Sequence, residues 1–485
     1  MANTKEKVGR AIASWARSWT KLPPRSNAVN PFKLLASLNR QQSMAFAAAF
    51  LGWTLDGMDF FMVTMNLKDI AKEFDVSVTQ LSWSITITLM LRPVGALLFG
   101  LAADKWGRRW PLMIDIIMFS AFELGTGFTQ TYTQFFIMRL FFGIAMGGEW
   151  GLGAALAMET LPQEARGIFS GIFQEGYSLG YLLAAVIYLG RDTIGWRGMF
   201  WIGCCPALLT IFIRFFVEES HTYELAKKQR EKRNISFIKE IGNLVKQHYL
   251  LLFYGICLMS AFNFMSHGSQ DLYPTFLQSS PLNYSPGRTT VTAVVYNIGA
   301  IIGGIIFGYV SQIFGRRRTM ILTACCGACF IPLWASTTQP FGGVLMGSFF
   351  LQLFVQGAWG VIPVHINELS PAGFRGTFPG LLYQCGNLVS SAASTIQSQL
   401  AAKSPTPDGH PDYSRVQMIF MGSIFAAVVV FAFIGPEECG ADLDQKELDL
   451  GREHGEQDHE SDLVIESSGE KALEAGDMAD AKAKV

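Results

Sequence analysis

The sequence has few charged residues for its length. Only 16% of its 485 residues are Asp, Glu, Lys or Arg, against roughly 25% in soluble domains, and half are hydrophobic. The charged residues cluster in short stretches, which leaves long apolar runs between them. This pattern excludes a soluble globular protein and predicts a protein embedded in a lipid bilayer. The net charge of −1, with basic residues in short loops rather than on one face, gives no sign of nucleic-acid binding.

The predicted outer loops have no cysteine. Seven of the eight cysteines lie inside apolar segments, and Cys439 follows the last of these segments. We therefore expect free thiols and no disulfide framework. The sequence also lacks a nucleophile–base constellation and the ligand spacing of a metal site. We expect neither enzyme activity nor a metal or cofactor.

What the sequence has instead are apolar runs of membrane-spanning length. About 20 apolar residues cross a bilayer as a helix, so the sequence predicts an all-α membrane protein with twelve transmembrane helices. The predicted spans are 44–66, 82–103, 110–129, 134–156, 167–190, 196–217, 249–278, 290–311, 319–336, 342–366, 376–401 and 416–435. The predicted regions are an N-terminal tail (1–43), a six-helix bundle (44–217), a basic central loop (218–248), a second six-helix bundle (249–436) and an acidic tail (437–485).

Positive charges predict the orientation in the membrane. Basic residues gather in the loops on one side, at Lys105, Arg108, Arg109, Arg166, 227–233, Arg316 to Arg318 and Arg375. The positive-inside rule then places both termini in the cytoplasm, and we expect a plasma-membrane location. The acidic tail is poor in aromatic residues, which predicts disorder. Its lysines and serines are candidate sites for regulatory partners.

Two motifs occur twice along the chain. GLAADKWGRR at 100–109 returns as GYVSQIFGRR at 308–317, and ETLPQEARG at 159–167 returns as ELSPAGFRG at 368–376. The nearly constant spacing predicts duplicated six-helix halves, an architecture of transporters that bind substrate between the halves. Together with Arg139, Gly143 and Gly147 of the fourth span, these motifs resemble the major facilitator superfamily.

The resemblance implies a gate on the cytoplasmic side, because the repeated loop motif closes that side in the superfamily. The implied gating residues are Asp104, Arg108, Arg109, Glu159, Arg166, Arg316, Arg317, Glu368 and Arg375. In each half a Glu precedes an Arg by seven residues, and we predict that these two pair in one state and separate in another. Gln312 stands where the first copy has Asp104, so we expect the second copy to be weaker or differently wired.

A polar stripe lies in the seventh predicted span. Asn263, His267 and Asp271 are four residues apart, so they share one face of a helix. Ionisable groups at membrane depth are costly and usually line a path for solutes or protons. A network that only holds helices together is the alternative. The stripe resembles the signature of fungal lactate and carboxylate permeases, proton symporters related to sialate transporters, at Asn263, Ser266, His267, Ser269, Gln270, Asp271 and Thr275.

Arg92 in the second span is the candidate partner for a substrate carboxylate. A guanidinium group binds a carboxylate through two parallel hydrogen bonds, and the permease resemblance also implicates an Arg in this helix. The alternative is a structural ion pair with a resident Asp. Gln384 and Asn387 of the eleventh span are weaker candidates, because amides also hold helices together. With Asn263, His267, Gln270 and Asp271, these residues make up the predicted substrate site.

Depth along the helices predicts a pair for proton coupling. Asp59 in the first span and Arg139 in the fourth lie at similar depth near the outer side, so we expect them to meet. The resemblance to proton-coupled members of the superfamily implies that such a pair couples protons. Asp56, one turn earlier, is a rival for this role. His267 and Asp271 are the other candidates to take the proton, since the ordinary pKa of His lies between acidic and neutral pH.

Four further acidic residues lie inside predicted spans. Glu149 and Glu175 share a depth, and we predict that they form a pair that shares a proton. Asp115 and Glu123 belong to the third span, which is usually peripheral, so a structural role is favoured for them.

Together these features predict proton-coupled symport of a small carboxylate, such as lactate, pyruvate, acetate or a small dicarboxylate, by alternating access. A symporter for sialic acid or a sugar is the alternative with the same fold. Arg92 argues against a neutral sugar but not against sialic acid, which is a carboxylate. A nutrient sensor that does not transport is a third reading, which the short tails disfavour.

Overall fold

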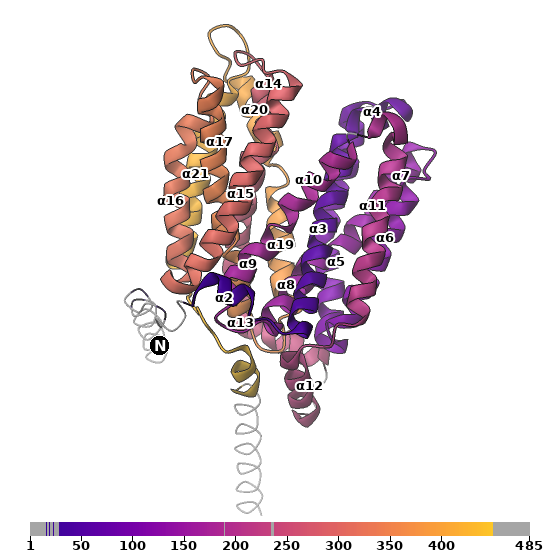
Figure 1. The fold of residues 1–485 in the computed structure, drawn as a ribbon, viewed down its shortest axis with the longest axis vertical. Coiled ribbons are helices and arrows are strands. Elements are labelled where there is room, and N and C mark those ends of the chain that lie inside the picture. The colour runs from indigo at the N-terminus through magenta and orange to yellow at the C-terminus, as the bar shows by residue number, and fades with distance from the viewer. Residues whose placement is uncertain are drawn as a thin grey trace, which may run out of the picture.

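The computed structural model describes Ala16, Trp19, Pro23 and residues 29–188, 190–233 and 237–449. Two helical bundles lie close together at one end and diverge toward the other, the upper end in Figure 1. We call the end that carries both GRR motifs and α12 (His221–Arg233) the basic end, and the other the far end. The core is apolar and its largest cluster of buried side chains draws on both bundles.

Six membrane-length segments form the N-terminal half. They are α3 (Arg40–Met65), α5 (Val78–Trp106), α6 (Arg109–Thr126), α7 (Tyr132–Met146) with α8 (Glu149–Thr160), α9 (Arg166–Gln174) with α10 (Gly176–Tyr188), and α11 (Arg191–Phe215). Capping boxes begin α3 at Asn39 and α5 at Ser77, where the cap side chain and a Gln three residues later exchange hydrogen bonds. The short helices α2 (Pro31–Leu35) and α4 (Leu67–Glu73) flank α3.

The C-terminal half repeats this plan. Its segments are α13 (Phe237–Gln270) with α14 (Tyr273–Gln278), α15 (Pro286–Phe314), α16 (Arg316–Trp334), α17 (Phe341–Trp359) with α18 (Ile362–Leu369), α19 (Phe378–Ser390) with α20 (Ala393–Lys403), and α21 (Tyr413–Ile434). Eight of the spans found in the described chain are long and apolar enough to cross a membrane. The segments α6, α9–α10, α16 and α19–α20 complete the two sets of six, so the predicted all-α, twelve-helix architecture is confirmed.

Glycines allow the two halves to touch at the basic end. A Cβ on Gly171 would lie 2.2 Å from the carbonyl oxygen of Gly304, and one on Gly151 would lie 2.4 Å from Cα of Gly380. Small residues at such contacts let membrane helices approach each other closely. The basic end is therefore closed by direct contact between backbones.

The chain after the last helix packs onto the basic end. The Glu437 carboxylate accepts a hydrogen bond from the Arg317 backbone N–H at 3.0 Å, and Glu447 pairs with Arg375 at 2.9 Å. Disorder was expected for the whole acidic tail, but residues 437–449 pack against the bundle because these carboxylates find buried arginines there. The rest of the tail, with its lysines, lies outside the described residues.

Candidate functional site

Four polar side chains join α13 to α19 between the two halves. His267 Nδ1 lies 3.1 Å from Asp271 Oδ2, and His267 Nε2 lies 3.3 Å from Asn387 Oδ1. The Asn387 amide in turn donates to Gln384 Oε1 at 3.0 Å. One ring nitrogen thus contacts a carboxylate and the other contacts an amide. The structure brings these four predicted residues into one chain of hydrogen bonds.

The side chains at one end of this hydrogen-bond network are more exposed than those at the other end. The Asp271 side chain is 42% exposed and that of His267 is 15% exposed, whereas Asn387 and Gln384 are buried. Asp271 lies at the end of α13 nearest α14, at the far end of the molecule (Figure 1). A solute arriving from the far end therefore meets Asp271 and His267 first.

Two residues of the predicted stripe are engaged elsewhere. Asn263 is buried and donates to the backbone carbonyls of Met259 at 2.9 Å and Tyr383 at 3.4 Å, so it ties α13 to α19. Gln270 donates to Gln352 Oε1 of α17 at 3.1 Å. Gln270 follows His267 by three residues, a rotation of about 300°, so its side chain points about 60° to one side of His267 and reaches α17 instead of α19. Gln352 was missed in the sequence, although an amide in an apolar span was the signal.

Arg92 forms a buried ion pair on the opposite half. Its Nη2 lies 3.5 Å from Asp56 Oδ1, and its guanidinium carbon lies 5.6 Å from the centre of the Phe60 ring. Arg92 is within electrostatic range of His267, and Tyr177 is within range of both Arg92 and Asp271. The single contact with Asp56 is long, and Arg92 Nε meets no acceptor in the described chain. Arg92 therefore keeps hydrogen-bonding capacity.

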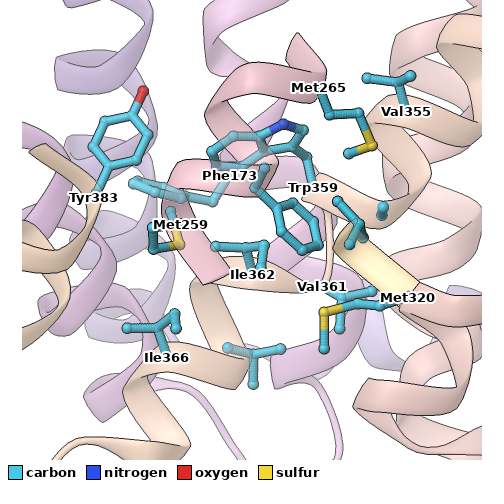
Figure 2. Close-up of a cluster of buried hydrophobic side chains, with 14 of the residues drawn as sticks. Phe173, Met259, Met265, Met320, Val355, Trp359, Val361, Ile362, Ile366 and Tyr383 are labelled. Atoms are coloured by element: carbon cyan, nitrogen blue, oxygen red, sulfur yellow. The ribbon is translucent and has the colours of Figure 1, made fainter. Parts of the chain in front are cut away.

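Aromatic rings from both halves pack against one another beside this polar site. The Tyr383 ring stacks on Trp150 with a centroid distance of 4.4 Å and contacts Trp53 and Trp359 at 6.0 and 5.8 Å. Figure 2 shows Tyr383 and Trp359 in one buried cluster with Phe173 and other apolar side chains. This cluster was not predicted, although a Trp in the interior of three spans was a signal for it.

The predicted pair of Asp59 and Arg139 has a third member. Asp59 is fully buried, its carboxyl group and that of Glu123 act on each other electrostatically, and Arg139 acts on both. Arg139 donates to Thr126 Oγ1 at 2.8 Å rather than forming a direct ion pair with Asp59 in the described chain. The sequence predicts the common depth of the two residues but not their interaction with Glu123, because the third helix is usually peripheral in this fold.

The predicted pair of Glu149 and Glu175 is wrong. Glu149 lies 3.3 Å from Arg214 Nη2, and Glu175 accepts a hydrogen bond from Ser178 at 3.0 Å and lies against Gly304. Equal depth on two helices says nothing about the direction in which their side chains point. Arg214 was not recognised as a partner from the sequence.

The first of the predicted gating residues, Asp104, joins the two halves at a helix terminus. Asp104 accepts hydrogen bonds from the backbone N–H groups of Gly376 at 2.6 Å and Thr377 at 2.9 Å, and from the Thr377 hydroxyl at 2.7 Å. Thr377 precedes the first turn of α19, where a negative charge is stabilised by the helix dipole. The corresponding Gln312 instead donates to the Gln163 carbonyl at 3.0 Å. The second copy of the motif therefore makes different contacts from the first.

In the described conformation the Glu and the Arg of each repeat do not pair with each other. Glu159 pairs with Arg108 at 2.9 Å and Glu368 pairs with Arg316 at 2.9 Å, because each GRR loop reaches the Glu of its own half. The other predicted gating arginines contact the ends of helices and the C-terminal segment: Arg109 with Phe215 O, Arg166 with Ala441 O, Arg317 with Glu437 and Arg375 with Glu447.

Replacement of Asp104 by Asn tests the gate. The amide keeps the shape but loses charge-assisted hydrogen bonds, which contribute about 1.5–3 kcal/mol each. We expect the basic end to open more often, so that a thiol reagent labels Cys439, half-buried there, at least tenfold faster. Asp408→Asn, on the loop after α20, is the control. Unchanged labelling of the Asp104 variant would contradict this role.

Comparison with known proteins agrees with this geometry. A sequence model described as Major Facilitator Superfamily matches residues 45–395. The chain belongs to the major facilitator superfamily. Like other members of this superfamily it is a multi-pass membrane transporter rather than an enzyme.

Two relatives and one solved structure show which known proteins this chain is similar to. A carboxylic acid transporter protein homolog of Saccharomyces cerevisiae is 33% identical over 443 residues, 86% of this chain and 71% of the relative. The sialic acid transporter NanX of Escherichia coli is 27% identical over 372 residues, 75% and 88% of the two chains. The fold is similar to a structure of the proton:xylose symporter XylE, with a TM-score of 0.67, 20% identity, and coverage of 84% and 98%.

Proposed function

We propose that this transporter carries a small carboxylate together with a proton. The observation that carries the proposal is the chain of hydrogen bonds from Asp271 through His267 to Asn387, which lies within electrostatic range of Arg92 from the other half. A cation with spare donors and a titratable imidazole are what a carboxylate and a proton require. Relatives named for carboxylic acid, cis,cis-muconate and sialic acid transport support a carboxylate substrate.

The residues divide the work in the proposed cycle. Arg92 binds the substrate carboxylate through its guanidinium fork, and the amides of Asn387 and Gln384 bond further substrate oxygens. His267 holds the proton, and Asp271 stabilises the imidazolium. The added proton and the anion together bring no net charge. The electrostatic cost of carrying them through the apolar core is therefore lower than for either ion alone.

The basic end is proposed to face the cytoplasm. The loops rich in Lys and Arg lie there, as the positive-inside rule requires, and both described chain ends lie on that side (Figure 1). In this orientation the described conformation is closed toward the cytoplasm. Opening requires Asp104 to leave the α19 terminus, while the far end closes over Asp271.

Labelled lactate uptake into proteoliposomes tests the proposal. For one proton per carboxylate, an inward gradient of one pH unit sustains about tenfold accumulation. We expect His267→Gln to abolish accumulation, because the amide does not carry a proton at these pH values. The matched control is His221→Gln, an exposed histidine on α12. Uptake by the wild type that ignores the gradient would contradict proton coupling, and transport of sialic acid without lactate would redirect the substrate assignment.

A further inference from the structure

A second cluster of charged residues lies inside the N-terminal half, away from the proposed substrate site. It consists of Asp115 on α6, Glu149 on α8 and Arg214 on α11, each at most 1% exposed. Arg214 Nη2 lies 3.3 Å from Glu149 Oε1 and donates to the Ala48 carbonyl at the same distance. A Cβ on Gly148, the residue before Glu149, would lie 3.0 Å from Asp115 Oδ1, so the two carboxyl groups are near neighbours and act on each other electrostatically.

The cluster has more negative than positive groups. Two carboxylates face one guanidinium group, and the other charged group that faces the pair is Asp56 from α3, already bound to Arg92. Neither oxygen of Asp115 nor Oε2 of Glu149 meets a hydrogen-bond donor in the described chain. Two adjacent carboxylates cannot both ionise in a dry site without a large cost. One proton shared between them removes the excess charge and supplies the missing donor.

The main chain of α3 connects this cluster to the proposed coupling residues. Gly52, Asp56 and Asp59 are four and three residues apart, so they line one face of the helix. A Cβ on Gly52 would lie 1.8 Å from Glu149 Oε1. Glu149 can therefore pack against this face of α3 only because residue 52 is a glycine. Acidic groups therefore follow one another along α3, from Asp59 through Asp56 to Glu149.

We propose that Asp115 and Glu149 form a second proton-binding site, which shares one proton and exchanges it with Asp56 during the transport cycle. The proton moves as H⁺ between carboxylate oxygens, so that one carboxyl loses exactly the proton that the other gains. Arg214 stabilises whichever carboxylate is left ionised. This inference rests on the proposed proton coupling and adds a site on the basic-end side of Asp56.

Infrared difference spectroscopy of the purified protein in lipid tests the shared proton directly. The wild type is expected to show, at pH 7, the carbonyl band of a protonated carboxylic acid. Asp115→Asn and Glu149→Gln should each remove the same band, and the double variant should remove no more, because one proton is shared and the remaining carboxylate pairs with Arg214. Glu175→Gln, at a buried carboxyl bound to Ser178, should be additive with either one. A band unchanged in both single variants would overturn the proposal.

Transport by the same variants tests the role of this proton. Glu149→Gln is expected to reduce gradient-driven lactate accumulation from about tenfold per pH unit to none, while exchange of internal for external lactate continues. Loss of the band with full accumulation would overturn the exchange step and leave a fixed structural proton. If the wild type shows no gradient-driven uptake, the proposed function is contradicted, but the shared proton is not. The shared proton is overturned only if the carbonyl band is unchanged in both single variants.

Discussion

Arg92→Gln is expected to lower carboxylate uptake by about 10²- to 10³-fold. Truncating one partner of a buried, hydrogen-bonded charge pair in a binding site costs about 2–5 kcal/mol of binding free energy, and each 1.4 kcal/mol is a factor of ten. The substitution removes two interactions at once, because Arg92 neutralises Asp56 and is also the proposed binding partner of the substrate carboxylate. Initial rates of labelled lactate uptake in proteoliposomes, at matched protein content, measure the effect.

A double variant separates these two contributions. In Arg92→Gln with Asp56→Asn no buried charge is left without a partner, so the protein is expected to express and fold normally. If Arg92 anchors the carboxylate, exchange of internal for external lactate at equal pH, which needs no net proton transfer, stays lost in the double variant. Recovery of this exchange would show that Arg92 serves only as the structural partner of Asp56, and it would contradict the proposed substrate site.

Gly151→Leu is expected to abolish net uptake without unfolding the protein. Even a Cβ at this position would lie 2.4 Å from Cα of Gly380, so a leucine prevents α8 and α19 from touching. The basic end then cannot close, and alternating access stops. We expect a thiol reagent to label Cys439 at least tenfold faster, in a chain whose other cysteines are replaced.

Gly422→Leu is the matched control for this prediction. Gly422 also lies inside a helix, α21, but no heavy atom lies within 4 Å of its added Cβ. The change in helix propensity is therefore the same and only the contact differs. Normal uptake by Gly151→Leu would show that the two halves close elsewhere than at this glycine contact.

The sequence predicted the architecture well because its signals are local. Apolar length determines the spans, and the repeated GRR motifs reveal the duplication. His267 and Asp271 were predicted to lie together because an interval of four residues puts side chains on one helix face whatever the surroundings. The same reasoning placed Asn263 on that face but did not reveal that its amide is bonded to the backbone of α19.

Contacts between distant helices were predicted less well. Depth in the membrane brought Asp59 and Arg139 to the same level, yet Glu123 lies between them in the electrostatic network. Depth also paired Glu149 with Glu175, whereas the rotation of each helix about its axis turns Glu149 toward Arg214. That rotation is set by packing of the whole bundle, including glycine contacts such as Gly52 with Glu149, and no spacing along one helix reveals it.

The most direct test of proton–carboxylate symport is to follow the internal pH while lactate enters. The proteoliposomes contain a trapped pH dye, with equal pH on both sides and a clamped membrane potential. Lactate is then added outside, so that it enters down its concentration gradient. The account predicts that the lumen acidifies by one proton for each labelled lactate that enters, beyond the leak of protein-free vesicles, and that His267→Gln shows no such acidification. Lactate entry through the wild type without acidification of the lumen would contradict it.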